Sequence, residues 1–265
     1  MVPILVLCGQ AGSGKDTVGN YLAYNHGAQC IALADPIKRI CQYFFEFTDE
    51  QLWGPSEFRG KIDDRYTGVE NQEKIRALIS KKLGTPQIDI RLLDVIPDNN
   101  LDYAYSELDK WAFDCRLKAR EGLTPRYCLQ TLGTEWGRLI DPDLWVEIGI
   151  ETAFQLLENP DLCYKPQTGL KQKEKADLKW GPTGIVITDG RFRNEILGVL
   201  KVGGKSLKID RPIASVSSTH QSETEVTQIP LNFFDYILHN DGSMKNLQIK
   251  ADSIIERAWK RGEDL

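Results

Sequence analysis

Short apolar runs alternate with amphipathic stretches along much of this 265-residue chain. Residues 2–8 form the first run, and later runs lie at residues 30–33, 185–188, 206–209 and 236–238. Continuous apolar runs of this length suit strands that are buried on both faces, and helical patterns separate most of them. Strands that alternate with helices build parallel sheets with helices on both faces, and ligands collect at the carboxyl ends of the strands. The pattern therefore predicts an α/β fold, and residues with useful chemistry stand at those strand ends: Gly9 to Thr17, Asp35, Asp189, Arg191 and Arg211.

Two polar stretches interrupt this alternation. Residues 48–123 combine scattered charges and a turn sequence at residues 97–100 with some helical pattern. They fit a mostly helical insertion in a single domain that covers residues 1–265. Residues 160–184 are rich in lysine and show little apolar periodicity. This stretch is typical of a solvated loop, and the alternative is a mobile lid over bound phosphates.

The first apolar run leads into a glycine-rich loop, Gly9-Gln10-Ala11-Gly12-Ser13-Gly14-Lys15-Asp16-Thr17. A helical pattern with Val18, Tyr21 and Leu22 on one face follows, so the motif stands between a strand and a helix. In that context the glycines let successive backbone N–H groups point at one anion, and the helix N-terminus adds partial positive charge. The alternative is a tight turn, which requires neither this glycine spacing nor the lysine. The sequence predicts a phosphate-binding loop (P-loop) with the Lys15 ammonium at the outer phosphates of a nucleoside triphosphate, held by Gly12, Ser13, Gly14, Lys15, Asp16 and Thr17.

Asp16 departs from the usual motif, in which a serine or threonine follows the lysine. The hydroxyl is displaced by one position to Thr17. A carboxylate at position 16 can attract Mg²⁺ directly or through water, or it can act as general base for an incoming phosphate acceptor. The alternative is a helix N-terminal Asp that stabilises the helix dipole. We therefore expect Asp16 and Thr17 to be magnesium ligands, and Lys15 and Asp16 to be catalytic residues.

A second carboxylate, Asp189, stands directly after the buried run at residues 185–188. There it can hold a magnesium-linked water or the acceptor. Arg191 and Arg193 follow, and they would stabilise the charge that develops on a transferred phosphoryl group. Glu195 lies four residues after Arg191 on a new helix, a spacing at which it can orient the guanidinium. The alternative is an ion-pair cluster with a purely structural role.

A helix is predicted to begin at Asp35, since Asp35 suits the N-cap, Pro36 suits the first helical position and an apolar stripe follows. This helix leaves the carboxyl end of the second predicted strand. Lys38 and Arg39 in its first turns can meet an anionic acceptor, or they are the exposed basic residues of an ordinary helix start. Asp35 and Lys38 are therefore candidates for acceptor binding.

A later helix carries two glycines in its interior. At 100° per residue, one narrow stripe contains Arg126, Gln130, Gly133 and Gly137, with Thr134 at its margin. Each helix-interior glycine costs about 1 kcal/mol relative to alanine, so some close approach should compensate. Either a ligand lies along the stripe, with Arg126 at a phosphate and Gln130 and Thr134 at a base or sugar, or another helix packs against the glycines.

Two further places can contact a nucleobase. Trp145 stands at the start of an apolar helix, where tryptophan is ordinarily a core residue but where its flat face also suits a base. The turn at residues 240–243 joins the last strand to a Ser-capped helix, and it lies beside the P-loop if the sheet order is typical. It can hold the adenine edge, or it is a plain turn.

Composition narrows the class of ligand. With 41% apolar residues the chain can bury a substantial core. Its net charge of −5 gives no overall attraction to nucleic acid polymers or anionic membranes, which favours a small phosphorylated ligand. The six cysteines form no CxxC pair and the three histidines show no metal-ligand spacing, so we expect reduced, mostly buried thiols. No apolar run is long enough to span a bilayer and no leader is recognisable, so a cytoplasmic location is expected.

Five motifs in this order resemble a known family: Gly9-x-x-Gly12-Ser13-Gly14-Lys15-Asp16-Thr17, Ala34-Asp35-Pro36-x-Lys38, Gln130-x-x-Gly133-Thr134, Asp143-x-Trp145 and Asp189-x-Arg191-x-x-x-Glu195. The family is that of the bacteriophage deoxynucleoside monophosphate kinases, within the nucleoside monophosphate kinase-like P-loop proteins. The motifs extend over most of the chain, and the Lys-Asp-Thr variant is expected in this family. The resemblance implies a three-layer P-loop fold, transfer of the γ-phosphoryl group of ATP to a deoxynucleoside monophosphate, dependence on Mg²⁺, and a homodimer in the cytoplasm, which is the host cytoplasm if the chain is viral.

Two other interpretations stay open. A kinase of the same fold can take another phosphorylated acceptor, such as dephospho-coenzyme A or phosphomevalonate, although the stripe from Gln130 to Trp145 favours a base over an isoprenoid acid. A non-catalytic module that binds ATP and signals by conformation is the alternative of another class. In the kinase interpretation the catalytic residues are Lys15, Asp16, Asp189, Arg191 and Glu195. The mostly helical insertion is then expected to help bind the acceptor, together with Asp35, Lys38, Arg126, Gln130, Gly133, Thr134 and Trp145.

Overall fold

The computed structural model describes residues 2–83, 101–174, 181–212 and 221–259. The chain forms two compact units. Residues 1–33 and 146–265 make the first, here called the sheet unit, and residues 34–145 make the second, here called the helical unit. The turn predicted at residues 97–100 lies outside the described residues, as do Lys175 and Lys179 of the lysine-rich stretch.

The sheet unit is built on five parallel strands. They are β1 (Ile4–Cys8), β2 (Gln29–Ile31), β5 (Ile185–Gly190), β6 (Lys205–Asp210) and β7 (Tyr236–His239). Their order is β2-β5-β1-β6-β7, so β1 is the central strand, and Val6 pairs with Ile187 of β5 and with Ser206 of β6. Every residue of β1 is buried, as its continuous apolar run predicted. The predicted α/β fold with a parallel sheet is confirmed.

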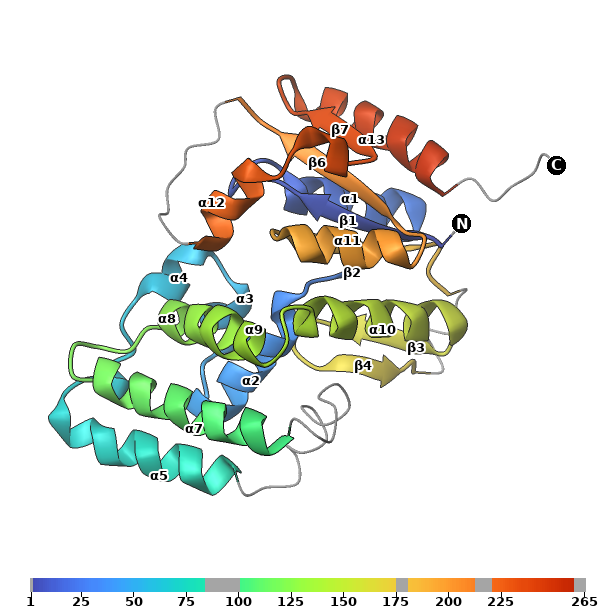
Figure 1. Cartoon of the computed structure of the whole chain (residues 1–265). Helices are drawn as coiled ribbons and strands as arrows, with labels where there is room; N and C mark the ends of the chain where they lie inside the picture. Colours follow the sequence, from blue (N-terminus) through green and yellow to red (C-terminus); the bar gives the residue numbers. More distant parts are fainter. Residues whose placement is uncertain (1, 84–100, 175–180, 213–220, 260–265) are drawn as a thin grey trace. The chain divides into compact units, whose positions relative to one another are not determined.

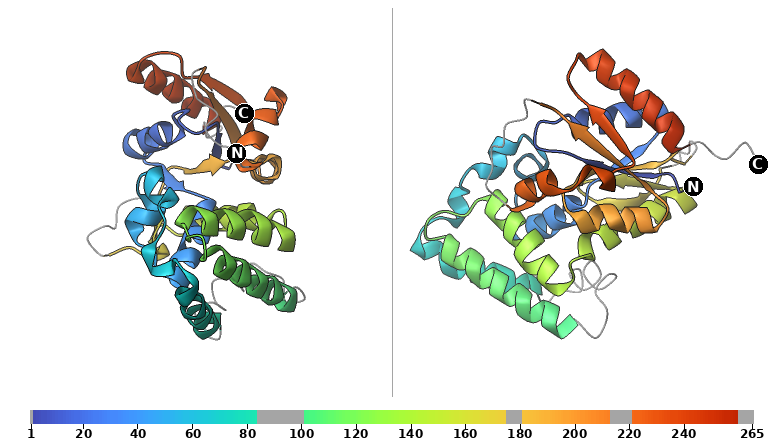
Figure 2. Two further views of the ribbon diagram at one scale, coloured as in Figure 1. Left: turned by 90° about the vertical axis from the view of Figure 1, so that its left-hand side faces the viewer. Right: turned by 45° about the horizontal axis from the view of Figure 1, so that its top comes forward.

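Helices cover both faces of this sheet (Figures 1 and 2). On one face, Leu5 and Leu7 of β1 belong to a core cluster with Leu22 of α1 (Lys15–His26) and Leu247 of α13 (Met244–Ala258). On the other face lies α11 (Arg193–Lys201), which packs against α10 (Leu144–Glu158) through Gly198. The shorter helices of the unit are α12 (Gln221–Gln228) and the 3-10 turn η6 (Leu231–Phe233). The three layers form because each of these helices has one apolar stripe to bury.

The stretch at residues 160–184 differs from the loop that the sequence predicted. Its described residues contain an antiparallel hairpin of β3 (Leu162–Lys165) and β4 (Gly169–Gln172), in which Cys163 pairs with Lys171. Gly169 has a φ of 71°, a left-handed conformation that suits glycine at the turn. The hairpin escaped the sequence pattern because its strands do not alternate apolar and polar residues cleanly. Its interpretation as a lid stays a prediction.

The regular elements that the structure describes in the helical unit are all helices. They are α2 (Ala34–Phe45), α3 (Asp49–Trp53), α4 (Ser56–Gly60), α5 (Gln72–Leu83), α7 (Leu101–Lys118), α8 (Pro125–Gln130) and α9 (Gly137–Ile140), with the 3-10 turns η1 (Asp64–Tyr66) and η2 (Val69–Asn71) and the π-helix η4 (Thr131–Trp136). Helices α5 and α7 lie side by side (Figures 1 and 2). The core is aromatic: the Phe45 ring has its centroid 5.4 to 5.7 Å from those of Phe47, Tyr66 and Trp111. This unit is longer than the predicted insertion, because α2 and α8 pack on the same core as α5 and α7.

The predicted start of α2 needs a correction. The helix begins at Ala34, so Asp35 lies in the first turn and is not the N-cap. Pro36 is compatible with this start, because the first N–H groups of a helix have no acceptor within the helix. The side chain of Asp35 is therefore available for contacts other than capping.

The helices are of moderate length. Helix α7 has 18 residues, and α10 and α13 have 15 each. None of the helices in the described part of the chain is long and apolar enough to cross a membrane.

Candidate active site

The P-loop joins the central strand β1 to helix α1. Gly12 has a φ of 74° and Gly14 has a φ of 106°, so both lie in the left-handed region where a residue with a Cβ is strained. Through these conformations the chain passes from the end of β1 into helix α1, which begins at Lys15. The loop thus has the conformation in which backbone N–H groups and a helix N-terminus can bind phosphate.

Lys15 extends over the loop. Its Nζ donates hydrogen bonds to the carbonyl oxygens of Gly9 at 2.6 Å and Gln10 at 2.8 Å. The ammonium is therefore held within the loop by two backbone acceptors, at a place where a bound phosphate can compete for it. The side chain of Lys15 is partly exposed, so solvent and ligand can reach it.

The ends of β6 and β7 support the loop from the side. Asn240 follows β7, and its Nδ2 donates to the Ser13 carbonyl oxygen at 2.8 Å. Arg211 follows β6, and its Nη1 donates to the Gly12 carbonyl oxygen at 3.1 Å. The turn after β7 therefore lies beside the P-loop, as the expected sheet order predicted. The sequence alone did not identify the Asn240 contact, since it depends on the order of the strands.

Ser13 offers a second indication of an anion site. Its side chain is buried, and its Oγ has no hydrogen-bond partner among the described residues. A buried hydroxyl without a partner is destabilising, and a phosphate oxygen in the loop can supply that partner. This orphaned hydroxyl fits the predicted role of the loop.

Asp16 and Thr17 lie in the first turn of α1, directly after the loop. Asp16 is exposed and Thr17 is partly exposed. Across the described ranges, no three His, Cys, Asp or Glu side chains gather as a preformed metal site. Mg²⁺ commonly uses one or two carboxylates together with substrate phosphates and water. The oxygen donors at this loop fit such a magnesium ion, bound with the nucleotide.

The end of β5 carries the second group of charged residues. Asp189 Oδ1 accepts a hydrogen bond from the Leu33 backbone N–H at 2.7 Å, which ties the carboxylate to the end of β2. Glu195 is buried, and its Oε2 accepts hydrogen bonds from the backbone N–H groups of Arg191 at 2.7 Å and Phe192 at 3.0 Å. Glu195 therefore fixes the backbone that carries Arg191, by capping the start of α11.

Arg191 and Arg193 differ in their surroundings. The guanidinium of Arg193 lies over the Phe233 ring, with Cζ 4.2 Å from the ring centroid. Arg193 is exposed, whereas Arg191 is partly buried and stands on the backbone that Glu195 holds. Of the two arginines, Arg191 is the one that the structure ties to the strand end.

In the helical unit, Asp35 organises two of its neighbours. It is 2% exposed, and its Oδ1 accepts hydrogen bonds from Trp53 Nε1 at 2.9 Å and from Lys38 Nζ at 3.3 Å. The Lys38 ammonium also lies 5.7 Å from the centroid of the Trp53 ring. The cluster joins two predicted site residues to Trp53, which the sequence did not indicate because Trp53 is 18 residues away from Asp35.

Arg126 lies at the surface of the helical unit. Helix α8 begins as predicted, with Thr124 as N-cap and Pro125 at the first position. Arg126 is exposed, and its Nη2 donates to the Ser56 carbonyl oxygen at 2.8 Å. A guanidinium has five N–H donors, so Arg126 can hold this bond and still grip a phosphate.

The predicted glycine stripe needs a correction, because α-helical spacing does not continue through it. Residues 131–136 form a π-helix, η4, between α8 and α9. A Cβ on Gly133 would lie 2.9 Å from Ile37 Cδ1, and a Cβ on Gly137 would lie 2.4 Å from Trp145 Cζ2. The structure thus favours close packing as the reason for both glycines.

Trp145 belongs to this packing. Its side chain is 3% exposed, and its Nε1 donates to the Gly133 carbonyl oxygen at 2.8 Å. This burial favours the core interpretation over a stacking platform for a base. Gln130 and Thr134 are partly exposed.

The cysteines are free thiols, as expected. Burial raises the pKa of Cys30 to about 11, and burial also raises the pKa of Cys8, at the end of β1. Protonated, buried thiols are poor nucleophiles. The four buried thiols therefore act as small apolar residues of the core: Cys8, Cys41, Cys115 and Cys128.

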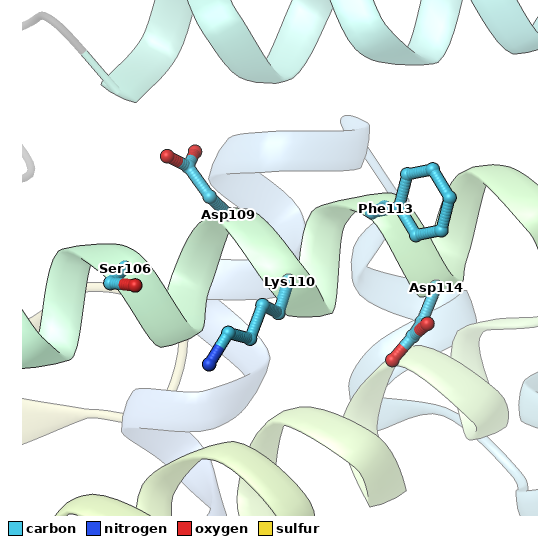
Figure 3. A pocket seen from close by; sticks show the side chains of 5 residues that line it. All are labelled: Ser106, Asp109, Lys110, Phe113 and Asp114. Carbon is cyan, nitrogen blue, oxygen red and sulfur yellow. The ribbon is translucent and has the colours of Figure 1, made fainter.

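A hollow of about 550 Å³ lies on α7 (Figure 3). It is lined by Ser106, Asp109, Lys110, Phe113 and Asp114. All five side chains come from one helix, and Asp109 and Phe113 point away from Lys110 and Asp114 (Figure 3). Ligand pockets normally have polar groups that converge from several elements. We assign this hollow no role.

The P-loop at the end of the central strand, with a lysine and strand-end carboxylates, defines a nucleotide-binding protein of the P-loop class. Within this class, the model of the family described as "Deoxynucleotide monophosphate kinase" matches residues 3–251. The chain belongs to this family, and it is an enzyme of the phosphotransferase type.

A curated relative agrees with this family. The chain is 24% identical, over 255 residues, to the "Putative deoxynucleotide monophosphate kinase" of Acanthamoeba polyphaga mimivirus. The match covers 96% of this chain and 97% of the relative. The deoxynucleotide monophosphate kinase family expected from the motifs is confirmed, whereas its bacteriophage branch stays a prediction. Neither a coenzyme A precursor, an isoprenoid acid nor a non-catalytic module is favoured.

Proposed function

We propose that this chain transfers the γ-phosphoryl group of ATP to the 5′-phosphate of a deoxynucleoside monophosphate, which yields ADP and the deoxynucleoside diphosphate. An oxygen of the acceptor phosphate forms the new bond to the γ-phosphorus, and the bond between that phosphorus and the bridging oxygen of ADP breaks. The observation that carries the proposal is the P-loop geometry, with Lys15 held over Gly9 and Gln10, in a chain of this family.

The loop and the start of α1 would hold the donor. Backbone N–H groups of the loop would bind the phosphates of ATP. The Ser13 hydroxyl would gain a partner, which it lacks among the described residues, and Lys15 would exchange its carbonyl acceptors for phosphate oxygens. The residues that we assign to ATP are Gly12, Ser13, Gly14, Lys15, Asp16 and Thr17.

Asp16 and Thr17 would hold Mg²⁺ together with the phosphates of ATP. When bound, Mg²⁺ neutralises phosphate charge and orients the phosphoryl group. Asp16 is exposed at the loop, so it can reach the ion directly or through water. In the alternative role, Asp16 accepts the proton of a protonated acceptor phosphate.

The end of β5 would act on the transferred group. Phosphoryl transfer depends mainly on positioning and on stabilising charge at the phosphoryl oxygens. Arg191 would stabilise that charge, and Glu195 would hold the Arg191 backbone in place. Asp189, anchored on Leu33, would orient the acceptor or a magnesium-linked water.

The helical unit would bind the acceptor. Lys38 and Arg126 supply two cations that can bind the 5′-phosphate, and buried Asp35 orients Lys38. Gln130 and Thr134 can donate and accept hydrogen bonds with the base or the sugar. Gly133 and Trp145 would contribute through the shape of this helix.

Three further expectations follow from the resemblance to bacteriophage enzymes. The proposal includes a homodimer, a cytoplasmic location, which is the host cytoplasm for a viral chain, and a phage origin. Light scattering on the purified chain would test the dimer, with a mass near twice 30.0 kDa expected.

The reaction is tested by incubating the chain with ATP, Mg²⁺ and dAMP, dCMP, dGMP or dTMP in turn. Chromatography should show ADP and one deoxynucleoside diphosphate in equal amounts with at least one acceptor. Replacing Mg²⁺ with excess chelator should abolish both products. Absence of diphosphate with all four acceptors would exclude the proposal.

A further inference from the structure

The hydrogen-bond register changes at Gly137. In an α-helix, the Gly137 N–H would donate to the carbonyl oxygen four residues back, on Gly133. In the structure it donates to the Leu132 carbonyl oxygen, five residues back, which is the π-helical register of η4. The Gly133 carbonyl therefore loses its α-helical donor.

Trp145 supplies the replacement. Its Nε1–H donates to the Gly133 carbonyl oxygen at 2.8 Å, and both residues are buried in the helical unit. A buried carbonyl without a donor is destabilising, so the indole N–H favours the π-register at this turn. The same ring packs against Gly137, where a Cβ would lie 2.4 Å from Cζ2 and 2.5 Å from Nε1.

We infer that Trp145 is a positioning residue, which selects the π-register of η4 through its bond to Gly133 and so sets the side of the helix on which Thr134 lies. The inference rests on the proposed acceptor role of Gln130 and Thr134. It assigns Trp145 an action through the backbone, without contact to the base.

The register matters because of helix geometry. In an α-helix, residues four apart such as Gln130 and Thr134 lie about 40° from each other around the axis. Thr134 lies inside the π-turn, which accommodates one extra residue, so a return to the α-register would turn Thr134 by several tens of degrees relative to Gln130 and Arg126. Gln130 and Thr134 are both partly exposed, and a change of register would therefore change the angle at which these two polar side chains meet a ligand.

The chain contains a matched control for the indole N–H. Trp259 in the sheet unit also packs on a glycine, since a Cβ on Gly184 would lie 2.7 Å from Trp259 Cε2. Its Nε1, however, has no hydrogen-bond partner among the described residues. Trp259→Phe therefore removes a partly buried indole and its packing, but no bond to a carbonyl in the described structure.

The experiment compares Trp145→Phe and Trp259→Phe with the unchanged chain in steady-state kinetics, with ATP, Mg²⁺ and the best of the four acceptors. We expect Trp145→Phe to raise the KM for the acceptor about tenfold, with the KM for ATP within about twofold of that of the unchanged chain. Trp259→Phe should leave both constants unchanged. Equal KM values for the acceptor in Trp145→Phe and the unchanged chain would overturn the inference, as would an equal rise in both KM values or a fall in kcat alone.

A second variant decides the question if Trp145→Phe does not fold. Gly133→Ala keeps the indole and its bond to the Gly133 carbonyl, while its new methyl group lies 2.9 Å from Ile37 Cδ1 and disturbs the packing of η4 from another side. Because the bond that selects the register is kept, the KM for the acceptor should stay within about threefold of that of the unchanged chain, and a rise of about tenfold or more would refute the inference. If the unchanged chain phosphorylates none of the four acceptors, the proposed function itself fails, which is a different result from an active enzyme insensitive to Trp145→Phe.

Discussion

The two units use glycine for different physical reasons. In the sheet unit, Gly12 and Gly14 adopt left-handed backbone conformations, with φ of 74° and 106°, that no other residue takes without strain. In the helical unit, Gly137 has an ordinary helical φ of −63°, and it is required because the Trp145 ring occupies the space of a Cβ. Gly12 and Gly14 shape a loop through their own backbone conformations. Gly137 leaves room for the side chain of another residue.

This difference bears on how each unit works. The loop of the sheet unit takes its shape mainly from its own backbone conformations, and Asn240 and Arg211 support it from the side, so its N–H groups are arranged for phosphate before any ligand binds. The acceptor candidates of the helical unit depend on contacts between distant residues, such as those of Asp35 with Trp53 and of Trp145 with Gly133. Variants in the two units should therefore affect different steps.

The largest expected effect is that of Lys15→Ala in the sheet unit. Removal of the ammonium takes away charge stabilisation at the outer phosphates, so kcat should fall by about 10³-fold or more. Steady-state rates of diphosphate formation measure this. Lys201 is an exposed residue at the end of α11, so Lys201→Ala is the matched control and should keep full activity. A Lys15→Ala enzyme within tenfold of the unchanged chain would contradict the assignment.

The next effect separates the two arginines near β5. Arg191→Ala should lower kcat by about 10²-fold or more with ATP affinity preserved, because its charge is needed mainly in the transition state. Arg193→Ala should change kcat by less than about threefold, since its guanidinium packs over Phe233. Single-turnover rates at saturating ATP would show the contrast, and equal losses in both variants would remove the distinction.

A smaller effect is expected from Arg126→Ala in the helical unit. Loss of one charged contact to the acceptor phosphate should raise the KM for the acceptor by about tenfold to a hundredfold. The KM for ATP should stay the same. The exposed Arg257→Ala, whose guanidinium bonds only within α13 at Ser253 in the described structure, serves as the control. A rise in the KM for ATP alone would show that Arg126 binds the donor and not the acceptor.

The smallest expected effects are changes in the free energy of unfolding when the two kinds of glycine are replaced. Gly137→Ala should lower the free energy of unfolding by about 1–3 kcal/mol, since its methyl group would overlap the Trp145 ring. Gly12→Ala should cost about 1–2 kcal/mol through left-handed strain alone, as no atom lies within 4 Å of its Cβ position. Gly60→Ala is the control, because its Cβ meets only an ordinary contact at 3.8 Å. Urea unfolding measures all three, and a Gly137→Ala chain as stable as Gly60→Ala would contradict the packing account.

The sheet unit could be predicted well from the sequence because its determinants are local. Short apolar runs identified all five strands of the parallel sheet, with bounds that differ by one or two residues, as at β2. The P-loop was recognisable because its glycines and lysine are contiguous. The Asn240 contact to Ser13 was missed, since it forms only once β7 stands two strands from β1.

The helical unit resisted prediction where tertiary contacts override local rules. The sequence predicted one α-helical stripe, but an indole 12 residues away from Gly133 stabilises a π-helical register. The partnership of Asp35 with Trp53 is likewise invisible in the spacing of residues. The hairpin of β3 and β4 was missed for a related reason. Its strands are defined by their pairing with each other and do not show an apolar pattern along the sequence.

In the proposed enzyme the sheet unit binds the donor and the helical unit binds the acceptor. Isothermal titration calorimetry of Lys15→Ala and Arg126→Ala, each with ATP and with the acceptor, measures this division of the substrates. We expect Lys15→Ala to lose at least about tenfold in affinity for ATP and none for the acceptor, and Arg126→Ala to show the reverse. If either variant lost affinity for both ligands equally, or if the two losses were exchanged, the division of the substrates between the units would be wrong.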